Sequence, residues 1–310
     1  MASSITKLTP EQTALKEAYF KTMFSSSLTT SSSSSHGLPP HWSRLLYHSP
    51  PMFAATLHLH AVPHQKRHLD PKTQSLISLA VASASTHLHL PAIKRHTKEA
   101  LDRGASREEI VETLALTSTL GIHACNIGVP ILVDVLREEG IEVETGMESM
   151  TQEQWKLRHD FEKKRGYWHP FWDLFLHLDP SFFAAYLEFS SVPWTSTNTI
   201  QTPQTLETPC PSLTEPFQPN SSSLVEQGAL PPKTKELIYC AFDAAATHLY
   251  QPGLKQHMRN VIRLGGSKEE IMEVLELATL LGGSTLEVGL GVLDQELEER
   301  KEEKEEADVD

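Results

Sequence analysis

The chain repeats itself at a fixed distance of 161 residues, and this internal duplication limits what the chain can fold into. Residues 69–132 align with residues 230–293 without a gap, with 26 identities in 64 positions. Two segments that shared only a helical composition would not match so often. Each copy therefore encodes the same structural unit, which occurs twice in the chain.

Weaker similarity extends the unit toward its N-terminal side. Residues 41–63 align with 171–193 at an offset of 130, and residues 8–20 align with 150–162 at an offset of 142. The offset changes only where a stretch rich in Ser, or one rich in Pro, Thr and Ser, is inserted. We therefore predict two domains of roughly 130 core residues each, a usual length for a domain.

The predicted domain boundaries follow from these alignments. The first domain covers residues 1–140 with a Ser-rich insertion at 25–36, and the second covers residues 150–300 with an insertion at 195–229. Both insertions hold too few apolar residues to offset the entropy cost of ordering them, so we expect surface loops or disorder there. Residues 301–310 form an acidic tail, which we expect to be a solvated helix end.

Local signals inside each unit are helical. A Ser or Thr followed three residues later by Glu or Gln is the capping-box pattern that begins helices, and it occurs at Thr9, Ser106, Thr151 and Ser267. Asp70-Pro71 predicts another helix start, Pro91 a break, and Gly104 a left-handed helix end. Sustained alternation and hairpin-turn dipeptides are lacking. The predicted fold class is all-α, with two tandem helical domains.

Two of these helices are expected to build the core. The segment 72–88 carries apolar residues almost all round, which predicts a central buried helix. In the helix that follows Ser106, the expected inward face consists of Ile110, Val111, Leu114 and Leu120.

Composition argues against several classes of function. The formal net charge of −13 does not suit a nucleic-acid partner, which requires a cationic surface. No run of 18 apolar residues occurs and the N-terminus lacks the apolar core of a secretory signal, so we expect no membrane partner. Cys125, Cys210 and Cys240 fall at no metal or redox spacing. Sparse, unpaired cysteines suit a reducing compartment, and we expect the cytoplasm.

Two histidine positions are duplicated, and they are the predicted catalytic residues. His87 matches His248, His96 matches His257, and a Pro-induced break separates the two members of each pair. We predict that each pair faces a shared cavity. Imidazole can donate or accept a proton near neutral pH, which suits acid–base catalysis. The structural alternative is that His87 binds helix carbonyls and that His96 bonds to His87.

Neighbouring residues are candidates for substrate binding. Thr86 and Thr247 adjoin the first histidine of each pair, and Lys94 and Lys255 could hold a substrate carboxylate, although an exposed helix face explains the lysines equally well. Three further candidates are not duplicated, namely Glu236, Tyr250 and His123.

The counterparts of these three residues differ in chemistry. Ser75 stands at the position of Glu236, His89 at that of Tyr250, and Ser284 at that of His123. We expect His123 to complete a site in the first unit only.

Sixteen histidines raise the question of a metal site. His-x-His occurs at 58–60 and 87–89, but two such residues on a helix point about 200° apart. The second copy does not repeat these pairs. We predict no bound metal and no cofactor.

Four segments carry a family resemblance. "LDPKTQSLISLAVASAS" and "GASREEIVETLALTSTLGIHA" in the first copy, with "LPPKTKELIYCAFDAAATHLYQPG" and "GGSKEEIMEVLELATLLGG" in the second, resemble the carboxymuconolactone decarboxylase family. That family also includes alkyl hydroperoxidase D-type thiol enzymes. The resemblance is strong over residues 69–132 and 230–293 and weaker over the preceding helices. It implies all-α subunits that form oligomers, so we expect a homo-oligomer built on the fused pair.

The thiol branch of the family differs from this chain at its active site. That branch carries Cys-x-x-Cys on the His-bearing helix and a Glu upstream. Here His87 and His248 stand at the first Cys position, no thiol follows them, and the upstream Glu is present only as Glu236. Without a thiolate, peroxide reduction has no nucleophile at this position.

The resemblance implies a cofactor-independent lyase or isomerase that acts on a small carboxylated or lactone-type molecule by His acid–base chemistry. In a decarboxylation, an imidazolium would stabilise the enolate and return a proton to carbon. The first alternative is a non-catalytic helical binding or assembly protein of the same fold. The second is an antioxidant of the alkylhydroperoxidase or peroxiredoxin type acting through Cys125 or Cys240, which the absence of Cys-x-x-Cys argues against.

Overall fold

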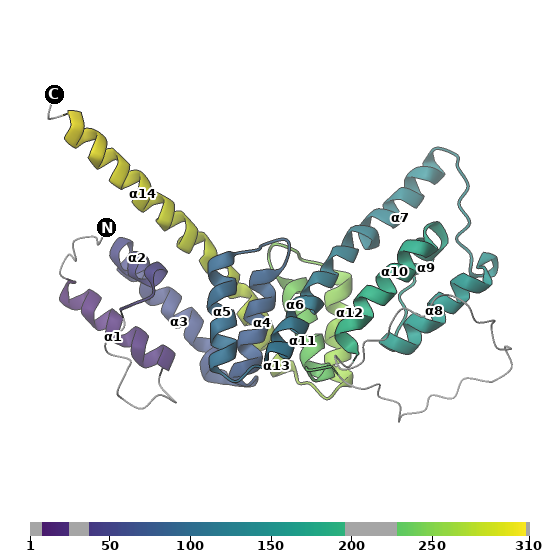
Figure 1. The fold of residues 1–310 in the computed structure, drawn as a ribbon, viewed down its shortest axis with the longest axis horizontal. Coiled ribbons are helices and arrows are strands. Elements are labelled where there is room, and N and C mark those ends of the chain that lie inside the picture. Colours follow the sequence, from purple (N-terminus) through teal and green to yellow (C-terminus); the bar gives the residue numbers. More distant parts are fainter. Residues whose placement is uncertain (1–7, 25–36, 196–227, 308–310) are drawn as a thin grey trace.

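The computed structural model describes residues 8–24, 37–195 and 228–307 (Figure 1). Every regular element in these ranges is a helix and none is a strand, which confirms the predicted all-α class. The predicted insertions at 25–36 and 195–229 fall almost wholly outside the described residues.

The two repeats contain the same succession of helices. The first repeat consists of α1 (Pro10–Phe24), α2 (Pro40–His48), α3 (Pro50–Lys66), α4 (Pro71–Ser83), α5 (Leu90–Asp102), α6 (Arg107–Ser118), η2 (Thr119–Ile122) and α7 (His123–Glu138). After η3 (Met147–Ser149), the second consists of α8 (Gln152–Arg165), α9 (Phe171–Leu178), α10 (Pro180–Ser191), η4 (Val192–Trp194), α11 (Pro232–Ala244), α12 (Gln251–Arg263), α13 (Lys268–Thr279), η5 (Leu280–Gly282) and α14 (Gly283–Ala307).

The predicted helix starts, and the predicted end of α5, lie where the sequence places them. All four predicted capping boxes form, at Thr9, Ser106, Thr151 and Ser267. Asp70 caps α4 by accepting a hydrogen bond from the backbone N–H of Thr73, and Gly104 after α5 has a φ of 83°. These local signals act within one helical turn, which is why sequence suffices to locate them.

The turn that follows α4 differs from the prediction. The helix ends at Ser83 rather than near residue 88, because the backbone N–H groups of His87 and Leu88 both donate to the carbonyl of Ala84. Leu88 lies in the left-handed region with a φ of 46°, and its counterpart Leu249 has a φ of 52°. Each such residue costs about 1–2 kcal/mol of conformational energy. His87 and His248 therefore lie in strained turns, not on helices.

This turn also changes the relation between His87 and His89. Their ring centroids lie 5.5 Å apart, whereas a helix would direct them to opposite sides. The prediction that His-x-His lies on a helix is therefore wrong for this pair.

One central core is shared by both repeats. It lies between α4 and α6 of the first repeat and α11 and α13 of the second, and its most buried residues include Leu76, Ile77, Leu237 and Ile238. The prediction that 72–88 contributes a central buried helix is confirmed over α4. The two repeats therefore fold around a common core, not around two separate ones.

The buried face of α6 was predicted only in part. Ile110 is buried, but the side chains of Val111 and Leu114 are 53% and 39% exposed. Glu112 and Leu116 point inward instead, because α6 packs against α11 of the second repeat as well as against α4.

Two smaller cores flank the central one, and each is completed by the opposite repeat (Figure 1). Leu286 and Leu290 of α14 pack against the aromatic cluster of α1–α3. Cys125 and Val129 of α7 pack against the aromatic cluster of α8–α10. Each repeat thus sends its last helix across to the N-terminal helices of the other.

A buried glutamate of the second repeat binds the first. Glu273 of α13 accepts hydrogen bonds from the backbone N–H groups of His68 and Leu69 at 2.8 and 3.2 Å. It also accepts one from the side-chain amide of Gln74 at 2.7 Å. These bonds fix the chain just before α4.

Glu112 of α6, in the first repeat, binds the second repeat in the same way. It accepts hydrogen bonds from the backbone N–H groups of Ala229 and Leu230 at 2.7 and 3.0 Å and forms an ion pair with Lys235 at 2.9 Å. Lys235 also donates to the carbonyl of Pro193 at 2.7 Å. The two glutamates occupy equivalent positions, so the repeats bind each other reciprocally.

Two continuous helical segments meet the length and composition expected of a membrane span. They are Arg107–Glu138 and Lys268–Ala307, with mean hydropathies of 1.6 and 1.2 over their most apolar windows, of which 28% and 17% are buried. Core helices of domains that never enter a membrane meet the same criteria. The expectation that the chain has no membrane partner therefore stays a prediction.

Candidate functional site

Each repeat has a cavity, and each cavity is completed by the other repeat. The first encloses about 1050 Å³, counting its open mouth, between α1–α5 and the α13–α14 segment. The second encloses about 680 Å³ between α8–α12 and the η2–α7 segment. Neither repeat builds its cavity alone, because the last helices are exchanged.

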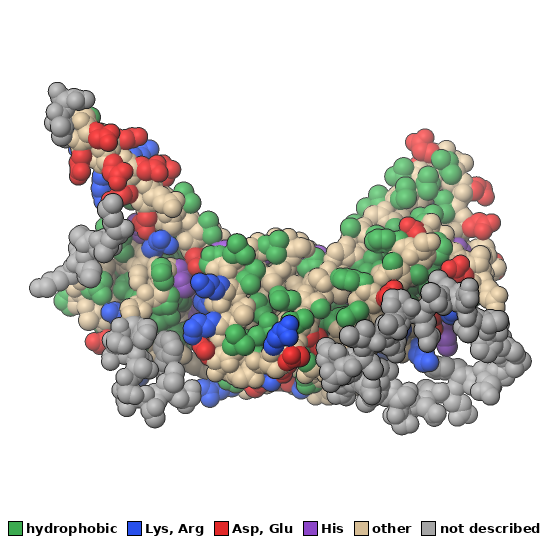
Figure 2. Space-filling view, in the orientation of Figure 1, with side chains coloured by type: hydrophobic (Ala, Val, Ile, Leu, Met, Phe, Trp, Pro, Cys, Tyr) green, Lys and Arg blue, Asp and Glu red, His purple; other side chains and the backbone are tan. Residues whose placement is uncertain are grey.

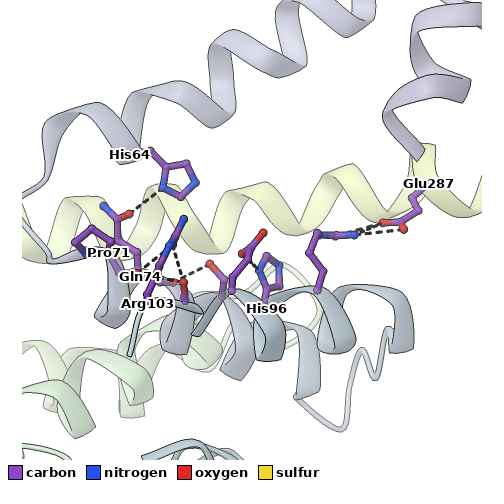
Figure 3. A network of polar contacts seen from close by, with 10 residues as sticks. His64, Pro71, Gln74, His96, Arg103 and Glu287 are labelled. Atoms are coloured by element: carbon purple, nitrogen blue, oxygen red, sulfur yellow. Dashed lines mark hydrogen bonds and ion pairs between the residues drawn. The ribbon is translucent and has the colours of Figure 1, made fainter. Parts of the chain in front are cut away.

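Ionisable side chains line the first cavity. They are His41, His60, His64, His87, His96, Arg95, Arg103, Glu99 and Glu287. Figure 3 shows part of this network, with His64 from α3, His96 from α5, Arg103 directly after α5 and Glu287 from α14. The cavity is therefore suited to a polar, charged ligand.

A histidine–carboxylate pair lies in this cavity. The Nδ1 atom of His96 is 2.9 Å from Oε2 of Glu99. Burial acts to raise the pKa of Glu99, but the hydrogen bond from His96 and the charges of His96, Arg103 and Arg95 lower that pKa below its usual value. Glu99 is therefore ionised, and it holds a proton on Nδ1 of His96.

Two guanidinium groups flank this pair. Arg103 donates to Oγ of Ser75 at 2.6 Å and to the carbonyl of Pro71 at 3.0 Å. Arg95 forms an ion pair with Glu287 of the second repeat at 3.3 Å. Arginine binds carboxylates in a planar, two-point geometry, so both are candidates for holding an anionic substrate.

Partly buried imidazoles in the same cavity are neutral at pH 7 because their pKa values are lowered. Burial, with the charges of His64 and Arg95, lowers the pKa of His60 to about 4. Burial and Arg95 likewise lower the pKa of His41 to about 4. His64 donates from Nδ1 to Oε1 of Gln74 at 2.8 Å, since the Gln74 amide nitrogen is itself donating elsewhere.

The second cavity is predominantly aromatic but contains a similar pair. Its aromatic lining consists of Phe161, Tyr167, Phe171, Trp172, Tyr186, Trp194, Tyr239 and Tyr250. The Nδ1 atom of His257 is 2.6 Å from Oε2 of Glu236, and Asn260 donates to the other carboxylate oxygen at 3.1 Å. The ring of Tyr239 stacks on His257 at 4.3 Å.

The carboxylate partner comes from a different helix in each repeat. Glu99 follows His96 by three residues on α5, and its counterpart in the second repeat is Asn260. Glu236 lies on α11, and its counterpart in the first repeat is Ser75. The loss of Glu at Ser75 is apparent from the sequence, but Glu99 was not predicted as a site residue. Comparing both positions together would have shown that the carboxylate moved without being lost.

The predicted histidine pairs are placed differently in the two repeats. His87 and His96 both line the first cavity, as predicted, although His96 bonds to Glu99 and not to His87. In the second cavity only His257 belongs to the lining. His248 instead lies beside His123, so the prediction of a shared cavity does not hold in that repeat.

His123 was expected to complete a site in the first unit, and this was wrong. It lines the second cavity, where its ring stacks on Tyr250 at 3.7 Å. The cause is the exchange of helices, since His123 begins α7. Its counterpart Ser284 correspondingly reaches the first cavity, where Oγ lies 3.3 Å from Nε2 of His87.

Of the other predicted substrate-binding residues, Glu236 and Tyr250 line the second cavity, whereas the threonines and lysines line neither cavity. The hydroxyls of Thr86 and Thr247 lie 3.2 Å apart at an exposed contact between the repeats. Lys94 and Lys255 are exposed on α5 and α12. The helix-face explanation for the lysines agrees with this placement.

The thiols are poorly suited to peroxide chemistry. Cys125 and Cys240 are both free, and burial raises the pKa of each above its usual value. Little thiolate is therefore available at neutral pH. Cys210 lies outside the described residues.

Comparisons with known proteins agree with this architecture. The model of the carboxymuconolactone decarboxylase family matches residues 50–122 and 211–295. A solved structure from Burkholderia xenovorans LB400, provisionally named a gamma-carboxymuconolactone decarboxylase subunit, is 37% identical with a TM-score of 0.75. That match covers 94% of this chain and 99% of the other. No curated protein matches the sequence. With one matched segment in each repeat, the chain belongs to the carboxymuconolactone decarboxylase family and carries its domain in duplicate.

Proposed function

We propose that the protein is a cofactor-independent lyase or isomerase that acts on a small carboxylated or lactone-type metabolite. The observation that carries this proposal is the histidine–carboxylate pair in each cavity. His96 with Glu99 and His257 with Glu236 make the same Nδ1 contact although the carboxylates occupy different positions. The contact between Nδ1 and a carboxylate is present in both repeats, although the carboxylate comes from α5 in one and from α11 in the other. This supports a chemical role for the imidazole.

Such a pair has the properties of an acid–base catalyst. A carboxylate on Nδ1 orients the ring, fixes the tautomer and stabilises the imidazolium. In a decarboxylation, the carbon–carbon bond to the substrate carboxylate breaks, carbon dioxide leaves, and the electron pair enters an enolate. The imidazolium N–H stabilises the enolate oxygen and then transfers its proton to carbon, and water reprotonates the ring.

The charged groups favour an anionic substrate. Arg95 and Arg103 can hold a carboxylate in the first cavity. In the second cavity, Arg165 donates to the carbonyl of Ser190 at 2.6 Å and lies over the ring of Trp194 at 5.2 Å. Its aromatic surroundings suit a flat, less polar ligand. The cavities themselves argue against a purely non-catalytic scaffold, in which the histidines would be packed without ligand space.

The cysteines support a location in the cytoplasm. Cys125 and Cys240 are free thiols rather than members of a disulfide, as in proteins of reducing compartments.

Turnover by single and double variants tests the proposal. Gamma-carboxymuconolactone is the first probe, followed by simpler lactone carboxylates, with carbon dioxide release as the measurement. We expect His96→Ala and His257→Ala each to remove the activity of one cavity, and the double variant to lose about 10²-fold or more in kcat. Lys98→Ala, on the exposed face of α5, is the matched control and retains wild-type turnover.

Two results would overturn the proposal. One is a double variant that is as active as wild type. The other is a wild-type protein that turns over no member of the lactone series.

A further inference from the structure

Three potential metal ligands from both repeats meet at the edge of the second cavity. They are His123 at the start of α7, Asp243 near the end of α11, and His248 in the turn that follows. The Nδ1 atom of His123 lies 2.5 Å from Nε2 of His248 and 3.9 Å from Oδ1 of Asp243. All three ligand atoms lie within 4.8 Å of one another.

Asp243 is a buried carboxylate without a hydrogen-bond partner. Its side chain is 0% exposed, and neither of its oxygens is hydrogen-bonded. Nδ1 of His123 and Nε2 of His257 lie 3.9 and 4.0 Å from its oxygens, which is too far for a hydrogen bond. An unpaired buried carboxylate is costly, and a bound cation would supply the missing charge.

The ring of His123 is held in place by its neighbour. It stacks on the ring of Tyr250 with 3.7 Å between the centroids, so its orientation is fixed before an ion binds. Imidazole is the commonest metal-binding side chain, and a ring nitrogen of each histidine belongs to this group of ligand atoms.

The backbone beside Asp243 is adapted to this side chain. A Cβ added to Gly253 would lie 2.4 Å from Oδ2 of Asp243. In the first repeat the equivalent residues are Ala92 and Ala82. In the second repeat Asp243 is larger than its counterpart Ala82, and Gly253 is smaller than its counterpart Ala92. The smaller residue leaves space for the carboxylate of Asp243.

The equivalent place beside the first cavity lacks this group of ligands. The positions equivalent to Asp243 and His123 hold Ala82 and Ser284, and only His87 remains as an imidazole. The same backbone therefore brings three metal-binding side chains together beside the second cavity and leaves a single one at the equivalent positions beside the first.

We propose that His123, Asp243 and His248 bind a divalent transition-metal ion, Zn²⁺ in the first place, across the contact between the two repeats. Two imidazoles and a carboxylate form a donor set that zinc accepts, leaving a fourth position for water. Zinc–nitrogen bonds of about 2.0–2.1 Å in tetrahedral geometry place two nitrogens roughly 3.3 Å apart. The two rings would separate by less than about 1 Å to admit the ion.

The ion would link the repeats, because His123 belongs to the first and the other two ligands to the second. The site adjoins the His257–Glu236 pair, but no step of the proposed reaction depends on it. Metal binding and turnover can therefore be tested separately, and either proposal can fail without the other.

Titration of the metal-free, full-length protein with Co²⁺ and Zn²⁺ tests the site. We expect one high-affinity ion per chain, with a visible Co²⁺ absorption band typical of four or five ligands, and a higher Tm when Zn²⁺ is bound. His123→Ala, His248→Ala and the isosteric Asp243→Asn should each weaken binding by at least about 100-fold, since each removes a direct ligand.

The pseudo-equivalent variant His87→Ala is the matched control, and we expect it to retain wild-type metal affinity. Circular dichroism and the Tm of each metal-free variant establish that it is folded. The proposal is overturned if wild type binds no ion tightly, if His123→Ala and Asp243→Asn bind as tightly as wild type, or if His87→Ala weakens binding as much as His248→Ala.

Discussion

His60 lies on α3 with its ring 5.5 Å from that of Trp42, at the wall of the first cavity. Because burial lowers its pKa to about 4, it stays neutral in the folded protein under conditions in which the unfolded chain would protonate it. Such a residue makes stability depend on pH even when it takes no part in catalysis.

We predict that the protein loses stability as the pH falls from about 6.5 to about 4. Over this interval the unfolded chain binds a proton at residue 60 that the folded chain does not, so the free energy of unfolding falls by about 3 kcal/mol for this group. In urea unfolding at pH 7 and pH 4.5, His60→Gln should show a smaller loss than wild type. His58→Gln, exposed on the same helix, should lose as much as wild type. Equal losses in His60→Gln and wild type would contradict the prediction.

Single residues were predictable where both repeats carry them. His87, His96 and His257 were found because each position is duplicated, and all three line a cavity. Glu99 was missed because its importance depends on its spatial relation to His96 and on the absence of a carboxylate at Ser75. Neither fact is visible at one position alone.

Helices were predictable where their signals are local. The capping boxes and the end of α5 at Gly104 needed no knowledge of the fold. The buried face of α6 was misjudged because that helix contacts both repeats, so Glu112 faces inward while Val111 is exposed. A single apolar stripe cannot describe a helix with two packing partners.

The buried Glu112–Lys235 pair gives a prediction about how α6 binds the second repeat. Glu112→Gln leaves Lys235, which is 1% exposed, without its counter-charge, and we expect a loss of about 3–5 kcal/mol in unfolding free energy. Lys235→Gln places a Gln beside Glu112, as Gln74 lies beside Glu273 at the equivalent positions. We expect this variant to lose no more than about 1 kcal/mol of unfolding free energy.

Urea unfolding of both variants provides the measurement. Glu273→Gln is the control, because its partner Gln74 carries no charge and its loss should be smaller than that of Glu112→Gln. If Lys235→Gln proved as destabilising as Glu112→Gln, the uncompensated charge would not be the cause.

The whole molecule exposes an apolar stripe on each projecting helix. On α7 it includes Ile127 and Ile131, and on α14 it includes the equivalent residues Val288 and Val292, each about half exposed. Figure 2 shows apolar side chains along the arm formed by α7 and acidic ones toward the end of the α14 arm. Exposed apolar surface of this kind usually marks a protein–protein contact.

We predict that these stripes bind a second copy of the chain, so that the protein is a homo-oligomer. The substitution Ile131→Glu together with Val292→Glu should reduce the mass measured by light scattering to that of a single chain, because a charge within an apolar contact is costly. Lys98→Ala, which lies outside the stripes, should leave the mass unchanged. A wild-type protein that is already a single chain would contradict the prediction.

The tandem architecture was predictable from the duplication, but the exchange of helices was not. An offset of 161 residues shows that two similar units exist without showing which helix of one contacts the other. His123 was assigned to the wrong cavity because the sequence does not show that α7 contacts the second repeat. Only the contacts of α7 with α9 and of α14 with α2 reveal the exchange.

Because of this exchange, the two halves of the gene do not encode two independent reaction chambers. A fragment that ends near residue 140 would include α7, which lines the second cavity. It would lack α14, which lines the first cavity, so its own cavity would be open to solvent. A mutation that alters specificity in one chamber can therefore arise in the coding sequence of the opposite half, and directed evolution of either activity has to sample both.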